Sequence, residues 1–128
     1  MTDTPPKATA YLMLGCPFSF KFLLFMTEAG LRDQIRVVPV DPEATHYEQL
    51  RTELEDATGK KASFPTVEVE PGIYRSETDE LIDYFANRHG IDPGDLPTLQ
   101  FYNDGVFKAM GNLYRENVQL REQLKTDA

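Results

Sequence analysis

The stretch Leu14-Gly15-Cys16-Pro17-Phe18-Ser19 contains the only cysteine of the 128-residue chain and decides the fold that we predict. The apolar run at 11–14 has the length of a strand, and the apolar run at 20–26 has the length of a helix. Pro17 has no backbone N–H, so it suits the first turn of a helix, where that N–H would lack a partner. We therefore expect a strand, a tight turn at Gly15 and a helix whose N-terminus carries the Cys16 sulfur.

Two interpretations of Cys16 follow from this placement. The free N–H groups and the dipole of a helix N-terminus favour an anion, and cysteines at such positions are often reactive thiolates. The alternative is a buried cysteine that packs as a small apolar side chain. Because Pro17 fixes where the helix begins, we favour the reactive thiol.

The composition restricts the class of protein. A content of 41% hydrophobic residues fits one globular domain with its own core. The net charge is −8, from 21 acidic and 13 basic residues, and no basic run suggests nucleic acid or an anionic membrane surface. No apolar stretch reaches the length of a membrane span. A single cysteine, and the absence of an apolar leader in residues 1–10, predict a cytoplasmic protein.

The remaining pattern predicts an α/β protein. We expect a second strand at 35–40, a surface helix at 42–57, a third strand at 64–69 and a short fourth strand at 73–74. Ser76 is a candidate N-cap of the next helix, with Asp79 three residues later, and Gly90 ends that helix. The order βαβα followed by ββα predicts a four-stranded mixed sheet with helices on both faces.

The C-terminal part is expected to form a loop at 91–97 and one long helix at 98–125. Asn103-Asp104-Gly105 is a hairpin-like sequence, so a strand pair at 99–107 is the competing prediction. The apolar residues expected on one side of the helix are Leu99, Tyr102, Phe107 or Val106, Met110, Leu113, Val118 and Leu124. That apolar surface exceeds what one small sheet needs, which predicts a homodimer through this helix.

Three motifs occur in an order and spacing that resemble a known family. They are Cys16-Pro17-Phe18-Ser19, Phe64-Pro65-Thr66, and Glu77-Thr78 followed by Leu81, Tyr84 and Phe85. Residues 11–90 resemble the thioredoxin-like N-terminal domain of glutathione transferases and, more loosely, glutaredoxins. The Cys-Pro-Phe-Ser form is similar to that of the omega-class, dehydroascorbate-reductase and chloride-intracellular-channel branches. The resemblance implies a thioredoxin-like domain at 1–90, with 91–128 as a linker and helix rather than a second domain.

The resemblance also implies roles for individual residues. Cys16 would be the catalytic thiol that forms a mixed disulfide with glutathione, and Pro65 would be a cis-proline whose neighbour Phe64 pairs with glutathione through its backbone. Glu77 and Thr78 would receive the γ-glutamyl carboxylate at a helix N-terminus, which suits an anion. The residues expected to contact glutathione are Pro17, Phe18, Lys21, Lys61 (with Lys60 as the alternative lysine), Phe64, Pro65, Glu77 and Thr78.

The sequence departs from the family pattern in ways that shape the functional hypothesis. Ser19 stands where dithiol glutaredoxins have a second cysteine, and Thr78 replaces a serine. Glutathione transferases also carry a helical second domain that supplies the site for bulky electrophiles, and only 91–128 remains here. We expect a monothiol thiol-disulfide oxidoreductase that uses glutathione as co-substrate and acts on a small-molecule or protein disulfide.

Three other possibilities were weighed for the chain. The main alternative is a thioredoxin-fold module that binds glutathione or a protein without catalysis. An iron–sulfur cluster held between two chains is a weaker option. His46 and His89 have no neighbour at metal-ligand spacing, so we expect no mononuclear metal site.

Overall fold

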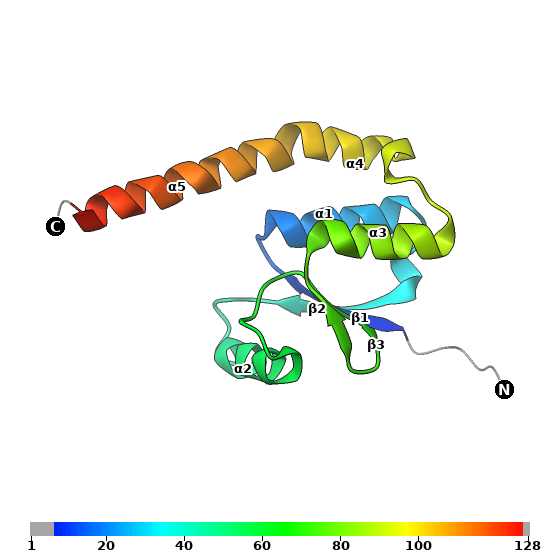
Figure 1. Cartoon of the computed structure of the whole chain (residues 1–128), viewed down its shortest axis with the longest axis horizontal. Helices are drawn as coiled ribbons and strands as arrows, with labels where there is room; N and C mark the ends of the chain where they lie inside the picture. Colours follow the sequence, from blue (N-terminus) through cyan, green and yellow to red (C-terminus); the bar gives the residue numbers. More distant parts are fainter. Residues whose placement is uncertain (1–6, 127–128) are drawn as a thin grey trace.

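The computed structural model describes residues 7–126, so the prediction about a leader at 1–10 falls mostly outside the described residues. The elements in chain order are β1 (Ala8–Met13), α1 (Pro17–Glu28), η1 (Arg32–Gln34), β2 (Ile35–Val40), α2 (Tyr47–Thr58), β3 (Thr66–Glu70), β4 (Ile73–Arg75), α3 (Thr78–His89), η2 (Pro93–Asp95), α4 (Pro97–Tyr102), η3 (Asn103–Phe107) and α5 (Lys108–Thr126). Figure 1 shows a sheet-and-helix body from which α5 projects.

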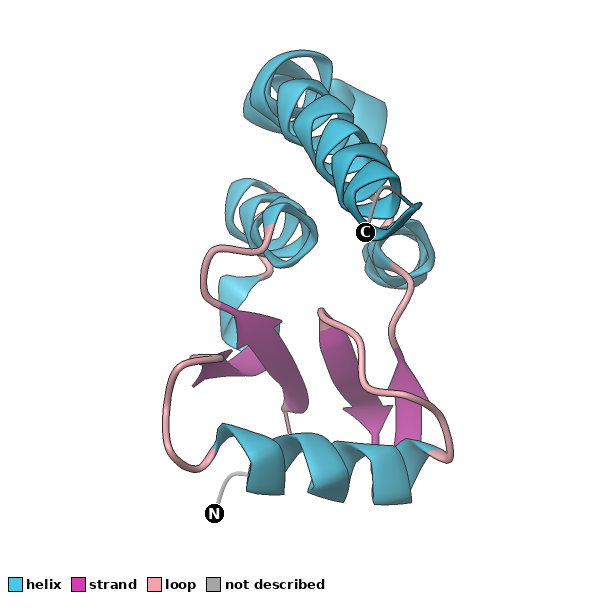
Figure 2. Ribbon diagram, turned by 90° about the vertical axis from the view of Figure 1, so that its left-hand side faces the viewer, coloured by secondary structure: helices cyan, strands magenta, loops and turns pink. Residues whose placement is uncertain are grey.

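The four strands form one mixed sheet in the order β2-β1-β3-β4. β1 and β2 are parallel, with Ala8 opposite Ile35, while β3 is antiparallel to both β1 and β4. Helices α1 and α3 cover one face of this sheet and α2 covers the other, as Figure 2 shows. The predicted thioredoxin-like α/β fold is therefore confirmed.

The core lies between the sheet and the α1–α3 pair. Phe22, Phe25 and Met26 of α1 are fully buried, as the nearly continuous apolar sequence of that helix predicts. They pack with Leu81 and Phe85 of α3, and the Phe22 and Phe85 rings lie 5.8 Å apart. The core thus fixes α1, and with α1 the position of Cys16.

Several predicted element boundaries were wrong. β3 begins at Thr66 rather than at residue 64 and ends at Glu70. β1 begins at Ala8, earlier than expected, because Ala8 and Ala10 pair with β2 despite their small side chains. Residues 42–46 form turns rather than the first turn of α2, since the Asp41 carboxylate accepts a hydrogen bond from Glu43 N at 2.9 Å. Ser76 is not the N-cap of α3. Glu77 occupies that position, and its side chain makes no capping hydrogen bond.

The C-terminal segment is helical, as preferred, but it is not one uniform helix. A π-helical turn, η3, interrupts it where the hairpin-like Asn103-Asp104-Gly105 lies. The carboxylate of Glu28 accepts hydrogen bonds from the Thr98 and Leu99 N–H groups at 2.8 Å, which joins α4 to α1. Desolvation alone would raise the pKa of Glu28, but these hydrogen bonds hold it below its usual value.

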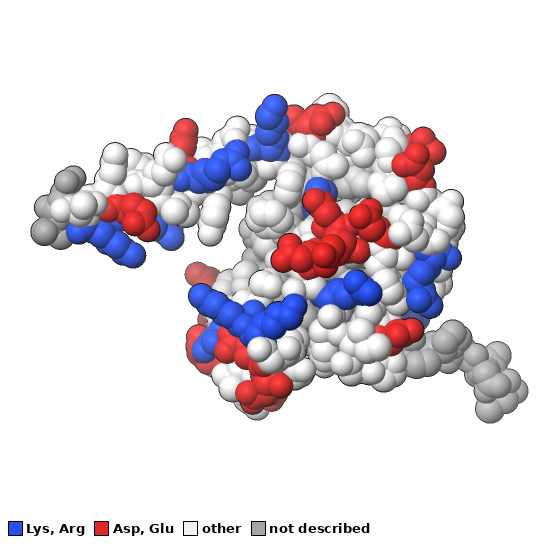
Figure 3. All heavy atoms as spheres, in the orientation of Figure 1, with Lys and Arg blue, Asp and Glu red and all other residues white. Residues whose placement is uncertain are grey.

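Helix α5 makes little contact with the body. Leu99 and Tyr102 of α4 are buried, whereas none of the residues of α5 is buried. Figure 3 shows α5 standing clear of the body, with an open hollow beneath it. Packing on the core therefore ends at the π-helical turn.

Candidate functional site

The turn before α1 places Cys16 at the helix N-terminus. Gly15 has a φ of +80°, which a residue with a Cβ adopts only with strain, and Cys16 N donates to Met13 O at 3.2 Å to close the turn. Cys16 is the N-cap of α1, and its sulfur accepts a hydrogen bond from Ser19 N at 3.4 Å. The sequence-based placement of Cys16 is therefore found in the structure.

Ser19 and Phe64 complete the surroundings of the sulfur. The buried Ser19 hydroxyl accepts a hydrogen bond from Met13 N at 3.0 Å and so ties α1 to the end of β1. The Cys16 thiol donates to Phe64 O at 3.7 Å, across 48 residues of sequence. The Phe64–Pro65 peptide bond is cis, and Pro65 is fully buried. The half-buried sulfur thus lies against the loop that enters β3.

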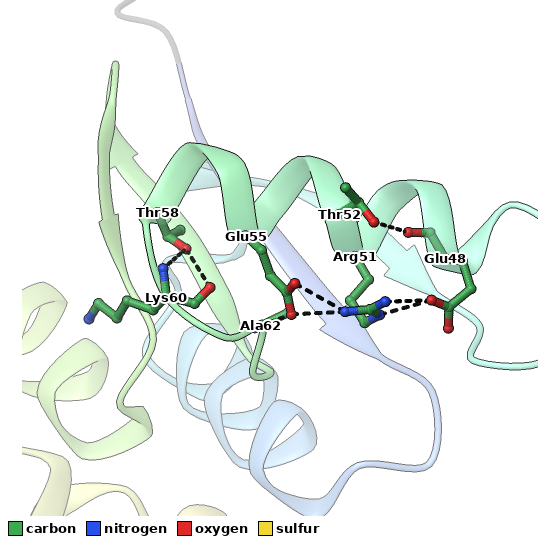
Figure 4. Close-up of polar contacts among 7 residues, drawn as sticks. All are labelled: Glu48, Arg51, Thr52, Glu55, Thr58, Lys60 and Ala62. Carbon is green, nitrogen blue, oxygen red and sulfur yellow. Dashed lines mark hydrogen bonds and ion pairs between the residues drawn. The ribbon is translucent and has the colours of Figure 1, made fainter.

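A polar network on α2 holds the loop that leads to Phe64. Arg51 contacts Glu48 at 2.5 Å and Glu55 at 3.0 Å, and Glu55 also accepts a hydrogen bond from Ala62 N at 3.0 Å (Figure 4). The bond from Ala62, together with Arg51, lowers the pKa of Glu55. Glu55 is therefore charged near neutral pH and connects the end of the 59–63 loop to the helix.

A polar cavity of about 340 Å³ lies between α1, the loop before β3 and the start of α3, and Cys16 is not among the residues that line it. Five residues that line it were predicted to contact glutathione, namely Phe18, Lys21, Phe64, Glu77 and Thr78; the others are Ser63, Ser76, Asp79 and Phe107. The residues at the start of α3 line this cavity, and a helix N-terminus suits a carboxylate. The structure therefore brings together most of the predicted contact residues.

Lys61, Pro65 and Pro17 lie elsewhere. Lys61 and Lys60 line a separate cavity of about 120 Å³ near Tyr74, whose pKa is raised first by desolvation and then by Glu68. Pro65 is fully buried and does not line the polar cavity, and Pro17 lines a different, apolar cavity. The predicted role of Lys61 stays a prediction.

Lys21 is held inside the polar cavity by two neighbours. Its Nζ lies 3.0 Å from Asp79 Oδ1 and 4.6 Å from the centre of the Phe107 ring. Its side chain is 13% exposed, compared with 84% for that of Asp79. The ammonium group therefore offers one fixed positive charge inside the cavity, part of which Asp79 neutralises.

An apolar cavity of about 550 Å³ lies on the opposite side of Cys16, towards β2. It lies between α1, the ends of β1 and β2, and the C-terminal segment, which contributes Tyr102, Val106 and Met110. The Tyr102 hydroxyl donates to Pro17 O at 2.8 Å. Burial raises the pKa of Tyr102, and the nearby Cys16 adds to this effect. Cys16 thus lines the apolar cavity, and it is linked to the polar cavity through its contact with Phe64.

Several residues of this site were not predicted as such from the sequence. Asp79 was considered only as part of a capping box, and Tyr102 and Phe107 only as members of an apolar stripe. One feature of the sequence could have indicated their role: Val106 and Phe107 both fitted the apolar side of the helix, so both could face the body. Both face the body, because Val106 lines the apolar cavity and Phe107 the polar one.

Metal clusters and membrane-spanning helices are both absent from residues 7–126. No group of three or more His, Cys, Asp or Glu side chains there could hold a metal ion. Among the same residues, no helix combines the length and apolar character needed to cross a membrane.

No protein-family model and no curated protein matches the sequence. Among solved structures, an omega-class glutathione transferase (3C) from Trametes versicolor is 18% identical, with a TM-score of 0.53 over 79% of this chain and 45% of its own. A second omega-class transferase of that organism (2C) is 17% identical, with a TM-score of 0.46 over 90% of this chain and 49% of its own.

A glutathione transferase homologue from Sulfitobacter, crystallised with bound glutathione, is 22% identical, with a TM-score of 0.48 over 73% of this chain and 39% of its own. The chain spans less than half the length of each of these three proteins. The omega-class transferase 3C, with its TM-score of 0.53 and 18% identity, shows that this chain shares its fold.

Proposed function

We propose that the protein is a glutathione-dependent monothiol thiol-disulfide oxidoreductase. The observation that carries this proposal is the position of Cys16 at the N-terminus of α1, where its sulfur accepts the Ser19 N–H and contacts the carbonyl of Phe64, which lines the polar cavity. A hydrogen bond from a helix N–H stabilises a thiolate more than a thiol. The single cysteine of the chain restricts the chemistry to a monothiol route.

The proposed reaction has two balanced steps. The Cys16 thiolate attacks the glutathione sulfur of a mixed disulfide, which forms a Cys16–glutathione disulfide and releases the substrate as a thiolate. The thiolate of a second glutathione then attacks the sulfur of the bound glutathione. This step releases oxidised glutathione and restores the Cys16 thiolate. One glutathione thiolate is consumed and one substrate thiolate is released, so the disulfide bond passes from the substrate to the glutathione pair.

The polar cavity would hold glutathione during both steps. Its γ-glutamyl carboxylate would bind at the start of α3, at Thr78 and Glu77, and Lys21 would attract a carboxylate from the other wall. The cysteinyl part would pair with the backbone of Phe64, whose carbonyl already lies 3.7 Å from the Cys16 sulfur. Phe18 and Phe107, with ring centres 5.3 Å apart, would cover this site on the side of the C-terminal segment.

The proposal extends to domain organisation, assembly and location. We propose that residues 1–90 are the glutathione-binding domain and that 91–128 form a linker and helix through which the protein forms a homodimer. A cytoplasmic location would supply the reduced glutathione that the second step needs.

One observation favours a second candidate, a module that binds glutathione or a protein without catalysis. The Cys16 thiol donates a hydrogen bond to Phe64 O, which occupies the sulfur within the protein. The two candidates therefore differ in whether Cys16 reacts.

Intact-mass measurement after incubation with oxidised glutathione distinguishes these candidates. The enzyme hypothesis expects one glutathionyl group on the wild-type protein, none on Cys16→Ser, and removal of the group by reduced glutathione. It also expects Cys16 to react with iodoacetamide at pH 6 faster than free glutathione does. Absence of an adduct, with alkylation no faster than that of glutathione, would leave only the binding module.

A further inference from the structure

The outer edge of β2 directs backbone groups away from the sheet. β2 is the first strand in the order β2-β1-β3-β4, so β1 is its one neighbour within residues 7–126. Val40 O accepts the N–H of Leu14 on the β1 side, and the direction of the backbone groups alternates along a strand. The groups of Ile35, Val37 and Pro39 therefore point to the outer edge, which is named here the β2 edge.

The β2 edge has one residue with both backbone groups available. Ile35 N donates to Arg32 O, and Ile35 O accepts a hydrogen bond from Arg32 Nη1 at 3.4 Å. Pro39 has no N–H, although its carbonyl can accept. Val37 directs both its N–H and its C=O outward. An extended chain beside β2 could therefore exchange two hydrogen bonds with Val37 and donate a third to Pro39 O.

A cavity of about 690 Å³, named here the basic cavity, lies at one end of the β2 edge. Its lining residues are Lys7, Thr9, Arg32, Ile35, Arg36 and Val37. They include three cations and no carboxylate, and none of these cations forms an ion pair with a described residue. In a chain of net charge −8, this end of the edge is a local positive patch that favours an anionic partner.

The fold places two carboxylates near the cations, and neither pairs with them. Glu68 lies two strands from Arg36 in the same cross-strand row. Its carboxylate accepts the Gly72 N–H at 2.9 Å and is therefore held at the turn between β3 and β4. Asp33 follows Arg32 in η1 but forms no ion pair with it. The basic cavity thus keeps its positive charge.

The other end of the β2 edge leads to Cys16. Val37 lines both the basic cavity and the apolar cavity, and Cys16 lines the apolar one. The hydrogen bond from Leu14 N to Val40 O, at 2.8 Å, puts the turn before Cys16 at the end of β2. Because strands rise about 3.3 Å per residue, an extended chain on this edge would reach from the cations to the thiol with about four to six residues.

We propose that the β2 edge binds an extended acidic segment of a protein, so that the disulfide substrate is a glutathionylated protein rather than a small molecule. The segment would pair with Val37 and place apolar side chains in the apolar cavity. Acidic side chains about four to six residues from its cysteine would meet the three cations. The chemistry rests on the proposed function: the Cys16 thiolate bonds to the glutathione sulfur, and the cysteine of the protein leaves as a thiolate.

Fluorescence anisotropy with an unreactive peptide tests the docking apart from the chemistry. The probe is a labelled peptide of about ten residues in which serine replaces the cysteine, valine and threonine alternate, and a run of aspartates follows. It should bind wild type and Cys16→Ser equally, and more weakly as salt rises from about 0.05 to 0.5 M. A peptide with asparagines in place of the aspartates should bind at least about fivefold more weakly. The reversed sequences are assayed as well, because either direction of pairing satisfies Val37, and the tighter order is used.

Variants of the protein locate the binding. The double variant Lys7→Gln, Arg36→Gln removes two cations of the basic cavity and should raise the dissociation constant of the probe at least about fivefold. Arg121→Gln with Lys125→Gln removes the same charge from α5 and should leave it unchanged. Val37→Pro removes the outward N–H and should weaken binding, whereas Val37→Ile keeps the N–H and should not.

A modified probe keeps the test decisive where Val37→Pro does not fold. N-methylation removes N–H groups of the peptide, and only alternate residues of an added strand direct these groups towards β2. Methylation of one alternate set should abolish binding to the wild-type protein, and methylation of the other set should not.

Equal affinity for the aspartate and asparagine peptides would overturn the proposal, and so would equal effects of the two double variants or of the two methylated probes. A dimer of the chain that is lost in Val37→Pro would also contradict it, because a second copy would then occupy the edge. Absence of a glutathione adduct on Cys16 would reject the oxidoreductase without changing the peptide affinities. The two proposals therefore fail in different measurements.

Discussion

At the scale of single residues, the Cys16 sulfur makes two hydrogen bonds, and the local sequence predicts one of them but not the other. Pro17 marks the start of a helix, so the hydrogen bond from Ser19 N follows from local pattern. The contact with Phe64 O joins residues 48 positions apart, and spacing alone does not predict it. Asp79 beside Lys21 is a similar case, because only the packing of α3 on α1 brings the two together. Local motifs therefore predicted the thiol and much of the polar cavity, but not the neighbours that fix Lys21.

The proposed carboxylate site at the start of α3 makes a prediction about glutathione affinity. The double variant Glu77→Ala, Thr78→Ala should weaken glutathione binding by roughly 1.5–3 kcal/mol for each charge-assisted hydrogen bond lost. Titration calorimetry measures this change. Asp83→Ala, on the same helix but outside the polar cavity, is the matched control and should bind normally. Equal affinity of the folded double variant and the control would reject the site.

Tyr102 predicts an effect on stability. Tyr102→Phe removes the hydrogen bond to Pro17 O and should lower the free energy of unfolding by about 0.5–1.5 kcal/mol at pH 7. Because the folded-state pKa of Tyr102 is raised above 10, its protonated form adds stability below pH 10, and this is lost as the pH rises through the folded-state value. Urea unfolding at pH 7 and above pH 10 measures both effects. Tyr114→Phe, at an exposed position, should show neither of them.

At the scale of elements, α4 depends on one carboxylate of α1. Glu28 accepts two backbone N–H groups, so Glu28→Gln should lower the melting temperature at pH 7. The folded-state pKa of Glu28 lies below the usual 4.5. Its contribution is therefore present above pH 4.5 and is lost as the pH falls through the lowered value. The difference between Glu28→Gln and wild type should shrink at acid pH, whereas Glu116→Gln should match the wild type throughout.

The elements also show why the sequence predicted some features and not others. The apolar run of α1 and the β-branched run of β2 predicted both elements because their patterns are strong and local. Asp41 and Glu43 start a turn whose hydrogen bond competes with helix formation, so the predicted start of α2 was too early. Glu28 of α1 accepts a hydrogen bond from Thr98 N of α4, 70 residues later in the chain. A contact over this distance leaves no periodic pattern in the sequence, so it was not predicted.

At the scale of the whole molecule, the body and α5 contribute unequally to stability. Shortening the chain to residues 1–107 should leave the unfolding free energy of the monomer unchanged, because α5 buries no residue. Shortening it to 1–90 removes the buried Leu99 and Tyr102 and should cost at least roughly 1.5–3 kcal/mol. Chemical unfolding tests both, with the full-length chain at a concentration where it is monomeric as reference. A 1–90 chain as stable as the reference would show that the segment 91–107 does not belong to the folded body.

The π-helical turn at Asn103–Phe107 has a consequence for the phase of the helix that follows. A π turn accommodates one residue more than an α turn, so η3 takes up a residue that would otherwise rotate α5 by about 100° about its axis. Deleting Gly105 should convert the turn to α-helix and keep Met110 facing the body. Inserting an alanine there should instead rotate α5, so that Met110 and the apolar residues after it face away from the body. The direction in which the nineteen residues of α5 face is thus preserved by the π turn, which absorbs the extra residue.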